Sequence, residues 1–423
     1  MRAQPGPGGP GASCSVEADG IGGVHDVRFD ELAQQGSGAA IPPVSLAARS
    51  DALVFVGIHR TSVPVVRRGV CPIGPSGRPP DACGSLHRVI SQPDPTSVQD
   101  FAGTTCVVTG GLGFIGSNVV HALVGRGATV RIVDALVPSH GGNLRNVAGL
   151  AVDVLHAGIG EAAVADVVDG ADVVFNLAGQ VSHTASMVDP QQDLRLNALD
   201  HAGFLETLRR VNPNARIVHA STRQVYGRVE RQPVDEETAA HPLDVNGVAK
   251  LAGEQLHMVY NHAFGMPATS LRLTNVYGPR QRLTSDELGF LPVFIRRALL
   301  GETIRIFGDG TQRRDCLHVS DVVGALLAAT ADTAVGRVYN VGHPLDHSLA
   351  EIAALIVAQT SSTGGVELVP WPDDHQRIDI GSFHTDSHRI LDELGWSAQM
   401  SIEDGIADTV CFYRGDPWYQ SPT

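Results

Sequence analysis

The sequence is poor in positive charge, and above all in lysine. Among its 423 residues Lys250 is the single lysine, and the formal net charge is −14 because 45 acidic residues outnumber 31 basic ones. This balance opposes non-specific binding to nucleic acid, which requires a basic surface. We therefore expect no nucleic-acid partner, while local arginines remain available for a small phosphorylated ligand.

Cysteine pairs, metal-binding motifs and long apolar runs are also missing. The six cysteines form no Cys-x-x-Cys pair, and the 18 histidines show no His-Glu-x-x-His pattern. These absences predict no metal site and a reducing, cytoplasmic environment. Gly, Asp or Arg interrupts each apolar run well before the ~20 residues that span a bilayer. The initial MRAQPGPGGPGAS has no apolar signal core, so we expect a soluble protein without membrane contacts.

The first hundred residues differ in composition from the rest. QPGPGGPGAS, CPIGPSGRPPDACGS and SQPDPTS are rich in turn and linker residues and show little periodicity. Such composition predicts a disordered amino-terminal extension over residues 1–100, or an assigned start upstream of the true one. A small accessory domain is the alternative, because DALVFVGIHRTSVPVV within this segment is apolar enough for a strand or two.

From Thr104 onwards, β-branched runs alternate with helical patterns. The strands that we expect are residues 104–110, 129–134, 171–179, 215–222 and 268–278, and the helices are 114–127, 193–211, a segment around Lys250, and 401–415. This alternation predicts an α/β fold with a doubly wound parallel sheet and helices on both faces. Beyond residue 280 the alternation loosens, which indicates a smaller carboxy-terminal part.

A glycine-rich loop lies between the first expected strand and helix. TGGLGFIGS places Gly110, Gly113 and Gly116 there. In a dinucleotide-binding loop the first glycine permits the turn, the second lets the backbone approach pyrophosphate, and the third packs the helix on the strand. Asp134 ends the next strand. A carboxylate there accepts hydrogen bonds from ribose hydroxyls and repels a 2′-phosphate, so we expect NAD rather than NADP.

Several ordered motifs resemble one known family. They are TGGLGFIGS, DVVFNLAGQVSH, ASTRQVYG, NGVAKLAGE, LRLTNVYGPR, FGDGTQRRDCLHVSDVV and a late LGW, spread over about residues 103–416. In this order they resemble the extended short-chain dehydrogenase/reductase family, in its nucleotide-sugar epimerase/dehydratase branch. The resemblance implies a Rossmann-type NAD-binding domain over residues 101–280 and a mainly substrate-binding part over 281–423.

The resemblance also implies site residues. The expected NAD contacts, besides the three glycines and Asp134, are Phe114 and Ile115 in the loop, Asp153 and Val154 beside adenine, and Leu177, Ala178 and Gly179 beside nicotinamide. Thr222 corresponds to the catalytic Ser/Thr that hydrogen-bonds the reacting sugar oxygen. Asn275 and Arg314 correspond to residues that hold the diphosphate, for which the planar guanidinium fork is suited.

Lys250 corresponds to the lysine of the family's Tyr-x-x-x-Lys motif, but the tyrosine position holds Asn246. The lysine ammonium ordinarily binds the nicotinamide ribose and lowers the pKa of the tyrosine. An amide cannot replace the tyrosine as acid or base. Three explanations remain open: another group moves the proton, an unusual substrate assists, or the protein binds ligands without turnover. The candidate groups are Asp244, His241, Tyr226, Arg223 and a water chain from Thr222.

The residues after Thr222 bear on the reaction. Dehydratases of this family carry Asp-Glu there, whereas this chain has Arg223 and Gln224, which cannot act as a carboxyl pair. We therefore expect an NAD-dependent nucleotide-diphosphate-sugar epimerase, acting at C4 through a keto-sugar. A dehydratase or other oxidoreductase of the family, and a catalytically impaired regulatory protein that binds NAD and sugar nucleotide, are the alternatives. The family's dimerisation mode implies a homodimer through residues 246–262.

Overall fold

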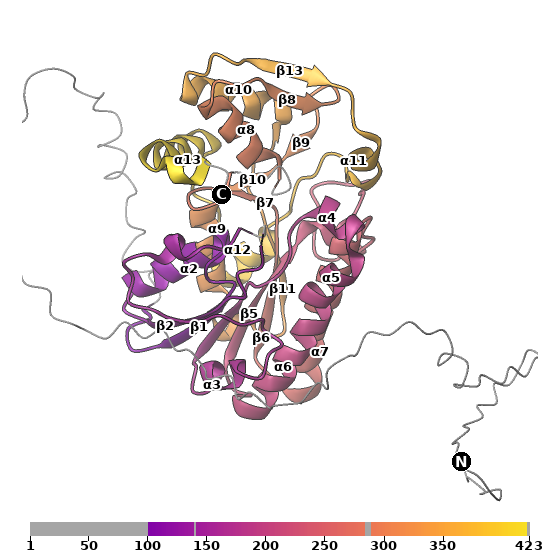
Figure 1. Ribbon diagram of the computed structural model, residues 1–423. Helices are drawn as coiled ribbons and strands as arrows, with labels where there is room; N and C mark the ends of the chain where they lie inside the picture. Colours follow the sequence, from indigo (N-terminus) through magenta and orange to yellow (C-terminus); the bar gives the residue numbers. More distant parts are fainter. Residues whose placement is uncertain (1–99, 139–140, 284–288, 421–423) are drawn as a thin grey trace, which may run out of the picture. The chain divides into compact units, whose positions relative to one another are not determined.

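The computed structural model describes residues 100–138, 141–283 and 289–420 (Figure 1). The predicted amino-terminal extension lies outside these residues, apart from Asp100. No helix in the described part of the chain is long and apolar enough to cross a bilayer.

The centre of the fold is a seven-stranded sheet in the order β11-β6-β5-β4-β1-β2-β3. The strands are β1 (Thr105–Thr109), β2 (Thr129–Val133), β3 (Asp153–Leu155), β4 (Val173–Asn176), β5 (Arg216–Thr222), β6 (Ala268–Leu273) and β11 (Val338–Val341). Every neighbouring pair is parallel. The predicted doubly wound parallel sheet is therefore confirmed.

Helices cover both faces of this sheet because its strands are apolar on both sides. Val107 and Val108, successive residues of β1, belong to two different core clusters, as the alternation of side chains along a strand requires. One cluster includes helices α2 (Phe114–Gly125) and α9 (Val319–Ala328). The other includes α3 (Val164–Val168) and α6 (Asp200–Val211), and α6 also packs on α7 (Val245–Phe264) (Figure 1).

A second, smaller group of elements follows residue 280. Helices α8 (Phe290–Leu299), α10 (Leu349–Thr360) and α13 (Ile402–Gly415) share an apolar cluster with β8 (Ile304–Phe307), which pairs with β13 (Val366–Val369). However, β11 and α9 also follow residue 280 and belong to the large sheet and its core. The segment 281–423 therefore contributes to both parts of the molecule.

The strand expected over residues 268–278 is divided at Thr274. Its first part is β6 of the large sheet, whereas β7 (Asn275–Tyr277) pairs with β10 (Cys316–His318). The Thr274 hydroxyl donates to Asp315 at 2.6 Å, and its backbone N–H donates to Val341 at 3.1 Å. These two bonds hold the chain where it leaves the sheet towards the carboxy-terminal part.

Candidate active site

The glycine loop forms a tight turn between β1 and α2. Gly110 has φ +66°, and the N–H of Gly113 donates to its carbonyl at 3.0 Å. A Cβ on Gly116 would collide with the same carbonyl, so only glycine allows α2 to approach the turn. Phe114 and Ile115 form the first turn of α2 and are half-buried. The free N–H groups of a helix start are therefore available at the carboxyl edge of the sheet.

Asp134 stands directly after β2 and braces this loop. Its carboxylate accepts the N–H of Leu112 at 3.0 Å and that of Leu136 at 2.8 Å. Burial raises its pKa, and these two N–H groups oppose the rise. Each carboxylate oxygen has a second lone pair, so the group can still accept ribose hydroxyls.

Asp153 and Val154 lie away from this edge. In the register of β2 and β3 they pair with Arg131 and Ile132, below the level of Asp134, and Asp153 is exposed. His156 is the residue whose charge acts on Asp134. The register therefore favours His156 over Asp153 as the neighbour of an adenosine at this edge.

The loop after β4 meets Lys250. The N–H groups of Leu177 and Ala178 donate to the Thr109 hydroxyl at 3.0 and 3.1 Å, which fixes the start of this loop. Gly179 has φ +155°, and a Cβ added there would lie 2.7 Å from Lys250 Nζ and 2.5 Å from Asn197 Oδ1. The ammonium thus packs directly against the Gly179 backbone.

Lys250 is a buried cation with no hydrogen bond or ion pair to any residue in the described ranges. Burial lowers its pKa from 10.5 to about 8, and the charge of Asp193 opposes this change. A buried charge without a partner is costly unless a ligand or a nearby counter-charge compensates it. The position is therefore suited to a ligand that brings hydrogen-bond acceptors.

Asn246, at the tyrosine position, belongs to a buried polar network. Its side-chain Nδ2 lies 3.1 Å from the Gln180 carbonyl, 3.2 Å from Gln180 Oε1 and 3.1 Å from Asp193 Oδ2. Asn197 donates to the other oxygen of Asp193 at 3.1 Å, from a π-helical turn, Arg195–Leu199, within the predicted long helix. Asn246 is only 1% exposed, as is Asp193. The amide therefore satisfies a buried carboxylate, a task for which its N–H groups are suited.

Thr222 ends β5 at the same edge of the sheet. Its hydroxyl accepts the N–H of Gln224 at 3.2 Å and so caps the short 3-10 helix Arg223–Tyr226. The Tyr226 hydroxyl donates to Asn340 and accepts from Arg272, both at 2.7 Å, within the core. These two hydrogen bonds engage the phenol in the core, where burial raises its pKa, and they favour a structural role for Tyr226.

Of the other expected proton carriers, His241 is exposed on a loop, whereas Asp244 is buried. Asp244 caps α7 by accepting the N–H of Gly247 at 2.6 Å, and it also accepts Gln224 Nε2 at 2.9 Å. The same carboxylate lies 3.0 Å from Nδ1 of His183. Burial acts to raise the Asp244 pKa, but His183 and the two donors outweigh it, so the pKa is lowered.

Sequence reasoning did not select His183. The only available signal was its place in NLAGQVSH, immediately after the loop expected beside nicotinamide. Its neighbour Asp244 is 61 positions away along the chain, so that pairing could not be read from spacing.

A set of buried donors lies next to Thr222. Arg223 donates to Asn275 Oδ1 at 2.8 Å, while Arg223 Nη1 and Asn275 Nδ2 are buried without partners. Burial, and then the charge of Arg314, lowers the pKa of Arg223 to about 10. Arg223 is thus bonded to Asn275, and it is close enough to Arg314 for the two charges to interact. The set favours an anion.

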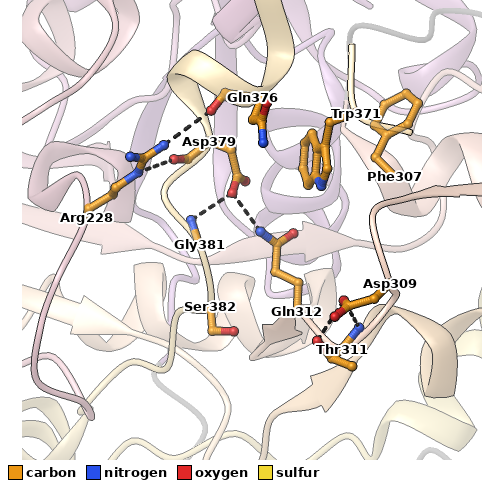
Figure 2. A pocket seen from close by; sticks show the side chains of 10 residues that line it. All are labelled: Arg228, Phe307, Asp309, Thr311, Gln312, Trp371, Gln376, Asp379, Gly381 and Ser382. Atoms are coloured by element: carbon orange, nitrogen blue, oxygen red, sulfur yellow. Dashed lines mark hydrogen bonds between the residues drawn. The ribbon is translucent and has the colours of Figure 1, made fainter. Parts of the chain in front are cut away.

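Arg314 also connects to a pocket of about 380 Å³ (Figure 2). Its guanidinium donates to the Gly381 carbonyl and pairs with Asp379 at 3.3 Å, and both residues line the pocket. Phe307 and Trp371 form aromatic walls, with ring centroids 5.5 Å apart. An anion at Arg314 would therefore lie beside a space with flat apolar walls and polar groups.

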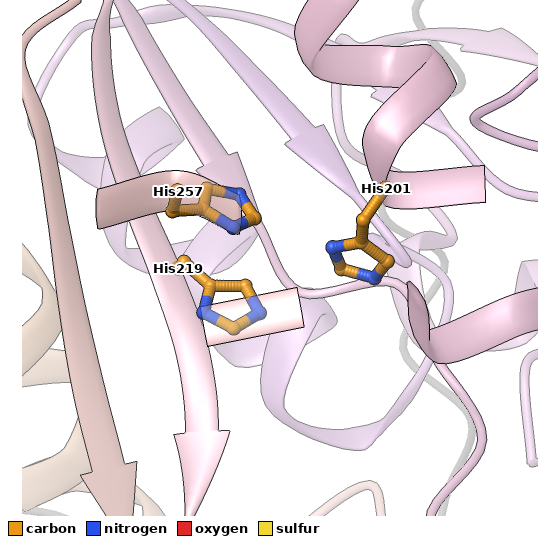
Figure 3. Close-up of side chains that lie close together, drawn as sticks. All are labelled: His201, His219 and His257. Carbon is orange, nitrogen blue, oxygen red and sulfur yellow. The ribbon is translucent and has the colours of Figure 1, made fainter. Parts of the chain in front are cut away.

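Three buried histidines, His201, His219 and His257, lie close together (Figure 3), and the charge of Lys250 acts on two of them, His201 and His219. Asn176 Nδ2 lies 3.2 Å from Nδ1 of His201 and 3.0 Å from Nε2 of His257. The rings of His219 and His257 stack at 4.1 Å with an interplanar angle of 19°. An imidazole lone pair lies in the plane of its ring, so two stacked rings cannot both coordinate one ion without repacking. This geometry assigns the cluster a packing role rather than a metal site.

Comparisons with known proteins show the family of this chain. Residues 106–342 match the model of the NAD dependent epimerase/dehydratase family. The chain is 31% identical to a UDP-glucose 4-epimerase of Mycolicibacterium smegmatis, over 73% of this chain and 98% of the relative. It is 30% identical to a dTDP-glucose 4,6-dehydratase of Xanthomonas campestris, over 75% and 95% of the two chains.

A solved structure shows the same likeness. The UDP-glucose 4-epimerase of Thermotoga maritima, determined with UDP-glucose, superposes with a TM-score of 0.68 at 30% identity, and the match covers 74% of this chain and 99% of the other. The fold, the ordered motifs and these matches lead to one conclusion. The chain belongs to the NAD dependent epimerase/dehydratase family.

Proposed function

We propose that the protein is an NAD-dependent epimerase of a nucleotide-diphosphate sugar, acting at C4. The observation that carries this proposal is the buried, unpartnered ammonium of Lys250 against Gly179. It lies at the carboxyl edge of the sheet, where the glycine loop and Thr222 also end. Ligands of open α/β sheets bind at that edge.

The residues at this edge fit NAD. Backbone N–H groups of the glycine loop would hold the pyrophosphate, Asp134 the adenosine ribose, and Lys250 the nicotinamide ribose. NAD, when bound, would take a hydride from the sugar carbon and return it to the opposite face. The negative charge of Asp134 disfavours a 2′-phosphate, which supports NAD over NADP.

The donors beside Thr222 fit a sugar diphosphate. Its phosphate oxygens would be bound by Arg314, Arg223 and Asn275. Arg223 Nη1 and Asn275 Nδ2 are buried donors without hydrogen-bond partners, and phosphate oxygens would supply the acceptors. The adjoining pocket with Phe307 and Trp371 would receive the nucleoside (Figure 2). Thr222 would hydrogen-bond the sugar oxygen that reacts.

Epimerisation is supported over dehydration by the contacts of the two residues after Thr222. Arg223 is bonded to Asn275, and Gln224 to Asp244. Neither can supply the acid and base that removal of water requires. A role in binding alone is disfavoured because Asn246 is built into a satisfied network, and because Lys250 keeps its position without a partner.

The test begins with the nucleotide content of the purified protein. We expect tightly bound NAD(H), detected by absorbance and mass spectrometry. Incubation with UDP-, dTDP-, GDP- and CDP-sugars should give a C4 epimer, identified by NMR with no loss of water from the sugar. A dehydrated product would assign the protein to the dehydratases, and binding without turnover over the whole panel would favour the regulatory alternative.

We further propose a homodimer through α7 and its neighbours, and a cytoplasmic location. An apolar groove is lined by Gln191, Leu194, Arg195, Ala198, Leu199, Ala202 and Leu256. Leu199 and Leu194 of this groove are 68% and 42% exposed, and a contiguous exposed apolar patch is typical of an interaction surface. Light scattering should show a dimer, and Leu199→Glu should reduce it to a monomer. A monomeric native protein would remove this proposal, and cell fractionation tests the location.

A further inference from the structure

His183 begins helix α4 (His183–Val188), which is fixed on the start of α7. The hydroxyl of Ser186, in α4, accepts the backbone N–H of Asn246 at 3.2 Å. Ser186 also donates to the carbonyl of His183 at 2.7 Å. Ser186 thus links the backbone of His183 to the backbone of Asn246, the residue at the tyrosine position.

The imidazole of His183 faces the carboxylate of Asp244, which hydrogen bonds hold in place. Asp244 has a side chain with 0% exposure, held by Gly247 N–H and Gln224 Nε2. Nδ1 of His183 is buried 3.0 Å from Asp244 Oδ2, while the side chain as a whole is 38% exposed. The ring N–H is not aligned with Oδ2, so the contact is not yet a straight hydrogen bond. Such bonds commonly straighten when substrate binds.

His183 and Asp244 are connected to the elements that carry the expected nicotinamide and sugar-nucleotide contacts. His183 follows the loop that carries Gly179, against which Lys250 packs. Gln224, which holds Asp244, is itself capped by Thr222. Helix α4 also contacts α11 (Asp373–Ile378), which supplies Gln376 to the pocket (Figure 1). His183 therefore lies on a segment that follows the expected nicotinamide loop and that contacts an element lining the pocket expected for the sugar nucleotide.

We propose that His183, oriented by Asp244, is the acid–base group that replaces the missing tyrosine. This inference rests on the proposed epimerase function. As the sugar hydroxyl is oxidised, its O–H bond breaks and the proton moves to Nε2, while the C–H electron pair leaves as hydride to the nicotinamide of bound NAD. The buried carboxylate stabilises the resulting imidazolium. In the return step Nε2 gives the proton back to the keto oxygen, so the histidine ends unchanged.

Other titratable groups lie on the elements that pack against α4. Helix α4 packs on α5 (Pro190–Leu194), α7 and α11. The titratable residues on these elements, with the cap of α7, are Asp193, Asp244, Lys250, Glu254, His257, Tyr260, His262, Asp373, Asp374, His375 and Arg377. Only Asp244 is in contact with the His183 ring, at 3.0 Å, among the ion pairs of the described residues.

The test compares His183→Gln with His388→Ala. His388 is a matched control because its Nδ1 also pairs with an aspartate, Asp386, at 2.7 Å, but on the exposed surface. We expect His183→Gln to lower kcat by about 10²–10⁴-fold, the usual contribution of a positioned acid or base. KM, bound NAD(H) and UDP binding should remain near native values. The decline of native activity at acid pH, where the imidazole is protonated, should disappear in the variant.

Three results would overturn the inference, and they are distinguishable. If native protein turns over no sugar nucleotide, the proposed function fails and the assignment of His183 fails with it. If native protein is active and His183→Gln keeps its rate and its acid limb, only the role of His183 is lost and the proton moves elsewhere. A loss of activity in His388→Ala equal to that in His183→Gln would also count against a specific role.

Discussion

Helix α7 contributes to two buried polar clusters that differ in one respect. Around its first turns, Asn246 donates to Asp193, whose charge also acts on Lys250, while the lysine ammonium has no hydrogen bond or ion pair among the described residues. Two turns later, His257 meets His201 and His219 around the amide of Asn176. Both clusters are almost fully buried.

The difference separates a site from a piece of core. In the histidine cluster Asn176 donates to two of the rings, His257 donates to the Gly253 carbonyl at 2.7 Å, and the stacked rings leave no common point for an ion. In the lysine cluster a cation and a glycine backbone face the edge where the glycine loop ends. Burial of polar groups alone therefore does not indicate a functional site here. A donor without a hydrogen-bond partner at the carboxyl edge of the sheet does indicate one.

The largest expected effect comes from removing the ammonium of Lys250, which has no hydrogen bond or ion pair among the described residues. Lys250→Met should lower turnover by about 10²-fold or more, because the charge that we propose to hold the cofactor is lost. Bound NAD(H) after purification should fall in parallel, which mass spectrometry measures. Unchanged NAD(H) content would mean that Lys250 is only a core residue, like its counterparts in the histidine cluster.

The histidine cluster should affect the stability of the fold at acid pH rather than turnover. Burial lowers the pKa of His257 from 6.5 to about 4. The unfolded chain therefore binds a proton that the folded chain refuses, and stability is lost as the pH falls from about 6.5 towards 4. For His257 alone the loss is on the order of 3 kcal/mol. Urea unfolding at several pH values should show a shallower loss in His257→Phe, with turnover at neutral pH retained.

A steep acid loss that is identical in native protein and His257→Phe would contradict this account. Added Zn²⁺ provides a second measurement on the same cluster. We expect no rise in the Tm of the native protein, because the stacked rings cannot share an ion. A clear rise that disappears in His257→Phe would make the cluster a metal site.

The smallest effect is expected from restoring the family's usual residue. Asn246→Tyr introduces a ring into a packed site and removes the donor to Asp193, which should cost about 2 kcal/mol of stability. Activity should fall by about tenfold if the site is specialised around the amide. Thermal unfolding and NMR turnover assays measure the two effects. A rise in activity would instead identify Asn246 as simple decay of a tyrosine site.

Much of the fold followed from local patterns. The strand and helix around TGGLGFIGS are observed at Thr105–Thr109 and Phe114–Gly125, since β-branched alternation and a glycine turn leave few other choices. The strand over 268–278 was predicted as one piece, but it divides at Thr274. Its division depends on Asp315, far away in the sequence, and no local pattern contains that bond.

The site was predictable to a similar extent. Lys250, Thr222, Asn275 and Arg314 were identified by motif, and they remain predicted site residues. They lie in α7, at the end of β5, at the start of β7 and in β9 (Arg313–Arg314). The sequence did not predict the contact of His183 with Asp244, the bond of Arg223 to Asn275, or the hydrogen-bond network of Asn246. Each depends on which side chains meet across elements that are distant in the sequence, and only packing settles that.

The sequence by itself determined the family, the glycine loop and the anomaly of Asn246 four residues before the single lysine, because these are properties of residue type and spacing. The tertiary structure decided what the anomaly means. It showed that the amide satisfies the carboxylate of Asp193, and that a histidine stands beside the cap of the same helix. A hydrogen bond or an ion pair is a relation between positions in space, and α4, α5 and α7 are brought together only by the folded core.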